Sequence, residues 1–317
     1  MSDPPRKKKR PFWRKRVRRS TAAGEHRPVL LAEVLAVLDP RPGQTIVDCT
    51  LGFAGHAVEL LKRISPDGLL IAMDLDAANI EPARVRLEEV GGLFALHQVN
   101  FAGLPTALAA EGINQIDGLL TDLGMSSMQL DDRDRGFSFM RDGPLDMRMD
   151  RTRGRTAAEM LKTLSVEELT KCFIELGDEP RGAQIAAAIV EARTDKPIER
   201  TQELRELIDR VAPVQVIRTP GAPPARVFQA LRILVNRELA NLAALLRLLP
   251  TILKPGAAAT IISFHSGEDR LVKTAFREGF RGGVYSAISE EAIRPTYAER
   301  QENPRSRSAK LRWARRG

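Results

Sequence analysis

The stretch "QTIVDCTLGFAGHAVELLKRI" (residues 44–64) has the pattern of a short buried strand, a glycine-containing turn and a helix. Its first seven residues form a β-branched apolar run that ends in turn-forming residues. From residue 54 onward the apolar residues recur at helical spacing. A strand that passes through a tight turn into a helix is the first part of a β–α–β unit, so this stretch predicts a parallel sheet.

The same alternation continues up to residue 124. Further strands are predicted over 68–76, 93–101 and 116–124, and helices over 77–90 and 103–112. Right-handed crossovers bring the C-terminal ends of such strands to one edge of the sheet, where ligands bind. The sequence therefore predicts an α/β fold with its functional residues at the strand ends.

Composition limits the classes of protein to which the chain can belong. Its 317 residues, 43% hydrophobic and 28% charged, are typical of a globular protein with a sizeable core. No apolar run approaches the roughly 18 residues of a membrane helix, and no apolar signal-peptide region is present, so we expect no membrane association. Cys49 and Cys172 are far apart and lack metal-ligand spacing. We predict buried free thiols, no metal site and a reducing, cytoplasmic location.

The net charge of +8 is concentrated at the two ends of the chain. Residues 1–20 hold ten Lys and Arg against one Asp, residues 294–317 hold eight against two Glu, and residues 21–293 hold 31 against 38 acidic residues. The basic arm, residues 1–24, is predicted to be disordered. A purely solvating arm is one interpretation. We favour a nucleic-acid contact, because Lys and Arg release counterions from phosphates and because Phe12 and Trp13 can stack on bases.

Two strand ends carry residues suited to a nucleoside cofactor. After the first strand, Gly52, Ala54 and Gly55 let the backbone approach a ligand at the electropositive start of a helix. After the second strand, Asp74 can accept hydrogen bonds from both ribose hydroxyls. The turn lacks the G-x-G-x-x-G pattern of a pyrophosphate site, which favours S-adenosylmethionine over NAD. A tight turn and a solvated aspartate are the alternative.

The segment "DRGFSFMRDGPLDMRMD" (134–150) follows the fourth strand. It is too charged for a core strand and too rich in Phe and Met for an ordinary solvated loop. Arg135, Arg141 and Arg148 are suited to reach RNA phosphates, and the Phe and Met side chains can hold the loop down or line a base pocket. The alternative is an interdomain packing loop in which Asp and Arg pair with one another.

Six blocks make the chain resemble the bacterial small-subunit ribosomal RNA methyltransferase H family. They are "HRPVLLAEVL" (26–35), "DCTLGFAGH" (48–56), "LLTDLGMSSMQLDDRDRGFSFMRDGPLDMRMD" (119–150), "FQALRILVNREL" (228–239), "ISFHSGEDRLVK" (262–273) and "NPRSRSAKLR" (303–312). They span nearly everything after residue 25, and the block at 119–150 is very specific. The resemblance implies S-adenosylmethionine-dependent N4-methylation of a cytidine in the decoding centre of 16S rRNA, with the small ribosomal subunit as partner. It leaves a homodimer open.

The resemblance also implies a domain organisation. A Rossmann-like S-adenosylmethionine-dependent methyltransferase sheet would comprise residues 25–131 and 228–317, with a mostly helical substrate-recognition domain inserted at 132–227. Independently of the resemblance, the spacing of apolar residues predicts helices over 156–164, 165–177, 182–193 and 201–212.

The ends of these predicted helices carry capping signals. Ser165 and Glu168 form a predicted capping box, and Thr201 is a predicted N-cap. A single helix over 225–249 then returns the chain to a fifth strand at 257–266. The end of that strand is expected beside the end of the fourth.

The resemblance assigns the cofactor site residue by residue. The glycine-turn contacts fall on Ala54, Gly55 and His56, the ribose acid on Asp74, the adenine contact on Phe101, and the fourth-strand contacts on Asp122 and Gln129. Three residues depart from the usual family pattern. Ala54 replaces Gly, Met128 replaces Pro and Gly267 replaces Leu. None of these changes removes a group that does chemistry.

The implied reaction is demanding, because the lone pair of the cytosine amine is delocalised into the ring. Transfer needs in-line placement of that nitrogen and an acceptor that stabilises its growing positive charge. Asp122 is the candidate acceptor, with His265 and Ser266 at the fifth strand end as second candidates. A cofactor-binding role for Asp122 and a structural role for His265 are the alternatives. A nucleotide-dependent oxidoreductase and a noncatalytic RNA-binding protein are the competing functions.

Overall fold

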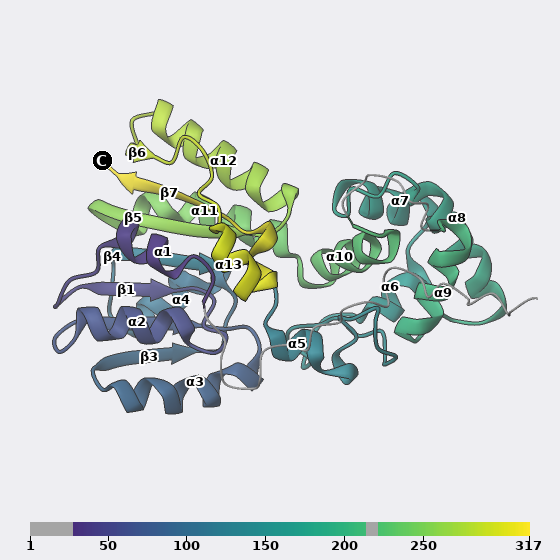
Figure 1. The fold of residues 1–317 in the computed structure, drawn as a ribbon, viewed down its shortest axis with the longest axis horizontal. Coiled ribbons are helices and arrows are strands. Elements are labelled where there is room, and N and C mark those ends of the chain that lie inside the picture. Colours follow the sequence, from purple (N-terminus) through teal and green to yellow (C-terminus); the bar gives the residue numbers. More distant parts are fainter. Residues whose placement is uncertain (1–27, 214–220) are drawn as a thin grey trace, which may run out of the picture.

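The computed structural model describes residues 28–213 and 221–317, so the basic arm lies outside the described residues. Figure 1 shows a sheet covered by helices and, beyond the C-terminal ends of its parallel strands, a separate group of helices. We call these parts the sheet unit and the helical unit. No helix among the described residues is long and apolar enough to cross a membrane.

The sheet has seven strands in the order β3-β2-β1-β4-β5-β7-β6. The strands are β1 Thr45–Asp48, β2 Leu69–Met73, β3 Leu93–His97, β4 Ile116–Asp122, β5 Leu253–Ser263, β6 Tyr285–Ile288 and β7 Lys310–Arg316. β1 to β5 pair in parallel, whereas β7 runs antiparallel to both β5 and β6. Asp122 is in register with Ile262, so the ends of β4 and β5 lie side by side as predicted. The predicted Rossmann-like α/β sheet is confirmed.

Helices cover both faces of this sheet. One face carries α1 Leu31–Leu38, α2 Gly55–Ile64 and α3 Ala77–Val90, and the other carries α4 Leu104–Ala110, α11 Glu238–Ile252 and α12 Ser266–Arg281. Successive strand residues point to opposite faces, so Ile46 packs toward α1–α3 and Val47 toward α4, α11 and α12. Because both faces are covered, the parallel strands contain continuous apolar runs such as Leu69–Met73 in β2.

Short elements complete the sheet unit near the strand ends. They are the 3-10 helices η2 Phe101–Gly103, η3 Arg133–Arg135 and η4 Pro304–Ser308, and the helices α5 Ser127–Asp131 and α13 Tyr297–Glu302. Figure 1 places α5 between the sheet unit and the helical unit.

The helical unit has a core of its own. It consists of α6 Ala157–Thr163, α7 Val166–Glu175, α8 Gly182–Asp195, α9 Thr201–Val211 and α10 Pro223–Asn236. Phe173, Ile189 and Leu231 belong to its apolar cluster. Ser165 and Glu168 form the predicted capping box at the start of α7. The predicted N-cap at Thr201 is wrong, because Arg200 takes that position and the Thr201 hydroxyl is engaged by the backbones of Gly143 and Arg141.

The single helix predicted over 225–249 is also wrong. The chain forms two helices, α10 and α11, separated by Arg237 in the left-handed conformation with φ 53° and ψ 36°. α10 packs Val227 and Leu231 into the helical unit, whereas α11 packs Leu242 against the sheet. The break exists because the two halves of this apolar stretch belong to different cores.

Candidate active site

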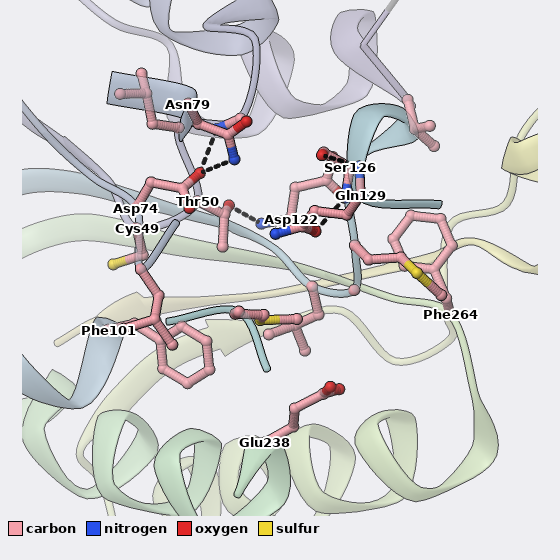
Figure 2. A pocket seen from close by; sticks show the side chains of 18 of the residues that line it. Cys49, Thr50, Asp74, Asn79, Phe101, Asp122, Ser126, Gln129, Glu238 and Phe264 are labelled. Carbon is pink, nitrogen blue, oxygen red and sulfur yellow. Dashed lines mark hydrogen bonds between the residues drawn. The ribbon is translucent and has the colours of Figure 1, made fainter. Parts of the chain in front are cut away.

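A pocket of about 410 Å³ lies at the C-terminal edge of the sheet, beside the ends of β1 and β4. The strand order reverses at this point, which is where open α/β sheets bind ligands. Residues from the ends of β1, β2, β4 and β5 and from the first turn of α11 line it. Figure 2 shows these side chains converging on one space.

The glycine turn after β1 forms one side of this pocket. Gly52 has φ +48°, and Gly55 and His56 line the pocket with it. No side chain caps α2, so the amide groups of its first turn are available to an anionic group. Ala54 adopts a left-handed conformation with φ 59°, and its fully buried side chain joins the core between α2 and the sheet. A methyl group is therefore accommodated at this position of the turn.

Asp74 connects the glycine turn to the end of β2. Its Oδ2 accepts hydrogen bonds from the Gly52 backbone N–H at 2.8 Å and the Asn79 side chain at 3.0 Å, and its Oδ1 accepts from the Asp76 backbone N–H at 2.8 Å. A carboxylate offers about four lone-pair positions, so about one remains for a ribose hydroxyl instead of the two that we expected. Burial is the largest influence on Asp74 and raises its pKa.

A second acid, Asp76, was not anticipated from the sequence. Its buried Oδ2 accepts hydrogen bonds from Gln129 Nε2 at 2.8 Å and Arg135 Nη1 at 2.7 Å. Arg135 is only 7% exposed, and its Nη2 also donates to the carbonyls of Arg148 and Met149. The structure therefore contradicts the predicted RNA contact of Arg135, because its guanidinium is buried among internal acceptors. The available signal was the position of Asp76 just before α3, where it serves as N-cap.

Asp122 stands at the end of β4 with an unused acceptor. Its backbone N–H donates to Thr50 Oγ1 at 2.6 Å, and its Oδ2 lies 3.9 Å from His56 Nδ1. Within the described chain, the buried Oδ1 has no hydrogen-bond partner. Burial, together with the charges of Asp48 and Glu268, raises the pKa of Asp122 well above its usual range.

His56 supports this side of the pocket as a neutral group. Its Nε2 lies 3.0 Å from the carbonyl oxygen of Val29. Burial lowers the pKa of His56 to about 4, so the imidazole is uncharged at neutral pH. It therefore shapes the wall next to Asp122 without adding a positive charge.

His265 and Ser266 have structural partners at the end of β5. His265 is the N-cap of α12, and its Nε2 lies 3.2 Å from Glu268 Oε1. The Ser266 hydroxyl donates to Asp178, in the turn between α7 and α8. From this strand end Phe264 and Glu268, rather than His265 and Ser266, line the pocket. These contacts argue against the predicted direct catalytic role of the two residues.

The far wall of the pocket comes from the chain around the α10–α11 break. Arg232 and Glu238 form a bidentate ion pair, with Nε to Oε1 and Nη2 to Oε2 both at 2.9 Å. Neither residue was predicted to be functional, although both are charged residues within the stretch predicted as a single helix. Ligand atoms of Glu238, His265 and Glu268 lie within 4.8 Å of one another, a spacing that a metal ion would also suit. The Arg232 guanidinium already supplies a cation here, so we assign the group to ion pairing.

A family model described as the MraW methylase family matches residues 23–317. This chain belongs to the MraW methylase family. Ribosomal RNA small subunit methyltransferase H of Geobacter sulfurreducens is 45% identical over 91% of this chain and 98% of that protein. The corresponding protein of Desulforapulum autotrophicum is 43% identical over 92% and 98%. Ribosomal RNA small subunit methyltransferase H 1 of Lachnoclostridium phytofermentans is 42% identical over 93% and 82%. The resemblance seen in the sequence is confirmed.

As an MraW methylase, the protein is an S-adenosylmethionine-dependent methyltransferase. Three features of the pocket fit that cofactor. The uncapped start of α2 suits its carboxylate, the remaining position on Asp74 suits a ribose hydroxyl, and Phe101 presents an aromatic surface on the same side in Figure 2. Asp122 Oδ1 remains as a pocket acceptor without a partner among the described residues. Gln129 lines the pocket, but its amide is engaged by Asp76 and by the Ser126 capping box.

The other two arginines of the predicted RNA contact differ from each other in this methylase. Both Arg148 side-chain donors that face Asp146 are paired with it, at 2.7 and 3.0 Å, and the side chain is 20% exposed. Arg141 is about half-exposed and pairs with Asp131 at 3.4 Å, and Arg305 at the pocket approaches the other oxygen of the same carboxylate at 3.8 Å. Arg141 is thus the more accessible cation of the two.

Proposed function

We propose that this enzyme transfers a methyl group to the exocyclic N4 of one cytidine in the decoding centre of 16S rRNA, within the small ribosomal subunit. The observation that carries the proposal is the unpartnered Asp122 Oδ1, which leaves a hydrogen-bond acceptor at the pocket edge of β4. The small-subunit ribosomal RNA methyltransferase names of the relatives support an RNA substrate.

The residues of the pocket divide into a cofactor side and a substrate side. S-Adenosylmethionine supplies a methyl group that is activated by a positively charged sulfur. Asp74, Phe101 and the start of α2 would hold it against the glycine turn. Asp122 faces the remaining space, which extends to Glu238 on α11 (Figure 2). A base that enters this space is placed between the cofactor side and the wall formed by α11.

Asp122 would act on the amine itself. When its carboxylate accepts a hydrogen bond from the amine, it favours a pyramidal nitrogen and stabilises the positive charge that develops there. As the nitrogen bonds to the methyl carbon, the bond from that carbon to sulfur would break with its electron pair left on sulfur. The nitrogen would then carry an excess proton, which Asp122 Oδ1 would accept before the proton passes to solvent. The raised pKa of Asp122 suits this exchange, because a more basic carboxylate is a stronger acceptor.

RNA would approach from the side shared by the sheet unit and the helical unit. The target cytidine has to leave its stack to enter the pocket, which is cheaper in irregular RNA than in a duplex. Arg141 and Arg305, joined through Asp131, are half-exposed cations at this side and suit phosphate oxygens. The basic arm would add sequence-independent attraction. Arg148 would support the loop through Asp146.

The deciding experiment uses isolated small subunits that lack the modification. The enzyme is incubated with labelled S-adenosylmethionine and either subunits or naked 16S rRNA, and the RNA is then digested to nucleosides for mass spectrometry. We expect N4-methylcytidine at one position. Methylation at ring carbon 5 or at a ribose oxygen would overturn the assigned atom, and a folded, cofactor-binding protein that methylates neither RNA would favour a noncatalytic role.

A further inference from the structure

The wall of the pocket opposite Asp122 contains a buried group of charges that the mechanism above does not use. Arg232 is 8% exposed, and the Glu238 side chain is 11% exposed. Glu268 and His265 lie beside them, with Nε2 of His265 3.2 Å from Glu268 Oε1. Buried ion pairs contribute little net stability, because desolvation offsets their attraction. Net stability alone therefore does not account for a carboxylate at this place.

Glu238 is oriented toward the substrate space. It is the first residue of α11 and directly follows the left-handed Arg237. Figure 2 shows its side chain rising from the helix into the pocket, across from Asp122. The bidentate contact with Arg232 uses one lone-pair position on each Glu238 oxygen, so about two of its four positions remain.

We propose that Glu238 recognises the amino edge of the target base, and that Arg232 fixes the orientation of its carboxylate. This inference rests on the proposed function, because it requires a base with an exocyclic amine. The amine carries two N–H groups. If Asp122 accepts from one and Glu238 from the other, both hydrogens of the amine are held while one face of the nitrogen stays free for the methyl group.

The hydrogen-bonding groups on the edge of the base then allow the site to distinguish cytosine from uracil. A carboxylate accepts from the N4 amine of cytosine, as acidic side chains do in base recognition. Uracil presents an oxygen acceptor at the same position, so its O4 would face a carboxylate with no hydrogen between them. A site built around a hydrogen bond rejects an analogue that lacks it by up to about 10⁴–10⁵-fold, because the buried group is left unpaired. Glu238 would thus select cytidine over uridine.

Arg232 helps the buried Glu238 side chain to act as a hydrogen-bond acceptor. Burial is the largest influence on the pKa of Glu238 and leaves it raised, with a further upward contribution from the nearby Glu268 carboxylate, whereas the Arg232 guanidinium and His265 act to lower it. The guanidinium therefore favours the ionised, acceptor-only form against burial and the Glu268 charge. Its fork also fixes the plane of the carboxylate, which leaves the remaining lone pairs pointing in defined directions. Arg232 is a positioning residue in this scheme.

The test compares Glu238→Gln with the matched exposed variant Glu81→Gln, both in the full chain. Small subunits are reconstituted from transcribed 16S rRNA with either cytidine or uridine at the target position. Single-turnover methylation of the cytidine form is measured at saturating S-adenosylmethionine across subunit concentrations, and the uridine form serves as a competing ligand. We expect Glu238→Gln to lower the rate constant about 10²–10³-fold and to leave cofactor affinity within about threefold.

The competition supplies a readout that a merely structural role would not change. The glutamine amide can donate to uracil O4, so the preference for the cytidine form over the uridine form should fall at least about tenfold. Glu238→Asp keeps the charge and should keep the preference while slowing transfer, and this variant also serves if Glu238→Gln does not fold. A wild-type rate and preference in Glu238→Gln, or a lost preference in folded Glu238→Asp, would overturn the inference.

The controls separate this inference from neighbouring ones. If the wild-type enzyme forms no N4-methylcytidine, the proposed function fails, whereas a change limited to the Glu238 variants concerns this inference alone. Dialysis of the enzyme alone against EDTA, before the subunits are added, should leave the preference for the cytidine form unchanged. A preference that is lost on dialysis and restored by zinc would instead assign Glu238, His265 and Glu268 to a metal ion and would overturn the proposal.

Discussion

Arg135 Nη1 donates a 2.7 Å hydrogen bond to the buried Asp76 carboxylate, 59 positions earlier in the chain. Asp76 directly precedes α3 beside the cofactor side, and Arg135 ends η3 in the segment that leads to the helical unit. The same carboxylate oxygen accepts the Gln129 amide. One buried acid thus attaches the segment after β4 to the end of β2, and the pocket takes its shape from both.

Arg135→Ala should destabilise the protein. The substitution leaves Asp76 buried without its cation, which typically costs about 3–5 kcal/mol. Urea denaturation measures the change in the free energy of unfolding, with the exposed Arg133→Ala as control, expected within about 0.5 kcal/mol of wild type. The salt dependence of RNA binding should not change in the folded fraction. Unchanged stability together with a flatter salt dependence would restore Arg135 as an RNA contact.

Asp74→Ala should weaken S-adenosylmethionine binding by about 1.5–3 kcal/mol, because a charge-assisted hydrogen bond to the ribose is lost. Isothermal titration calorimetry measures the effect. Asn79→Ala removes only one hydrogen bond that supports Asp74 and should therefore cost less. Equal affinities for the wild type and folded Asp74→Ala would remove Asp74 from the cofactor site.

Asp122→Asn should lower kcat by about 10²–10³-fold with little effect on cofactor affinity, since one preorganised electrostatic partner is weakened. Because the pKa of Asp122 is raised, the acceptor form is lost as pH falls through that raised value. The wild-type single-turnover rate should therefore decline on acidification, and the Asn variant should lose this part of the profile. If saturating S-adenosylmethionine restores the full rate in the variant, Asp122 serves only cofactor binding.

Asp48→Asn should stabilise the protein at alkaline pH. Burial is the largest influence on Asp48 and raises its pKa from 3.8 to about 7. Between these values the folded state holds a proton that the unfolded state has released, so stability falls as pH rises and levels off above about 7. Asn avoids this loss and can still accept from the Thr50 backbone N–H. Guanidinium denaturation should show the variant ahead at pH 8 and level with wild type at pH 4. An equal difference at both values would contradict the assigned titration.

Deletion of residues 1–20 should leave cofactor binding and the melting temperature unchanged, because this segment lacks core-forming periodicity. Binding to small subunits should weaken and depend less steeply on salt, since fewer phosphate contacts release counterions. Filter binding across a series of salt concentrations measures both quantities. An unaltered salt slope would mean that the arm has a different partner.

β6 and β7 were not predicted, and four of the seven residues of β7 are Lys or Arg. The parallel strands β1 to β5 were predictable because each contains a short apolar run, and their parallel pairing followed from the β–α–β alternation. The end of the helix at Asn236 was not, because the apolar pattern runs unbroken through 225–249 and Arg237 is an ordinary helix-forming residue. Only the packing of the two halves on different cores reveals the break. Local pattern identifies a helix, whereas its end can depend on tertiary contacts.

In the site, too, some residues were predictable from local sequence pattern and others depend on tertiary contacts. Asp74 and Asp122 were found because each lies near the C-terminal end of a predicted strand. Arg135 and Arg141 look alike in the sequence, and only the fold shows that one is buried against Asp76 while the other is half-exposed. Glu238 was not predicted as a site residue, because its ion pair with Arg232 and its position in the pocket both depend on the break at Arg237.

The break between α10 and α11 also determines where a chimera of this protein can be joined. Arg232 belongs to α10 and Glu238 to α11, so their ion pair spans the junction between the two units. A chimera that exchanges the helical unit at Asn236 would separate the partners and bring together an arginine and a glutamate from unrelated backgrounds. A junction after the first turn of α11 keeps Arg232 and Glu238 in the same segment. The helical unit together with the first turn of α11 is therefore the segment that can be exchanged as a whole.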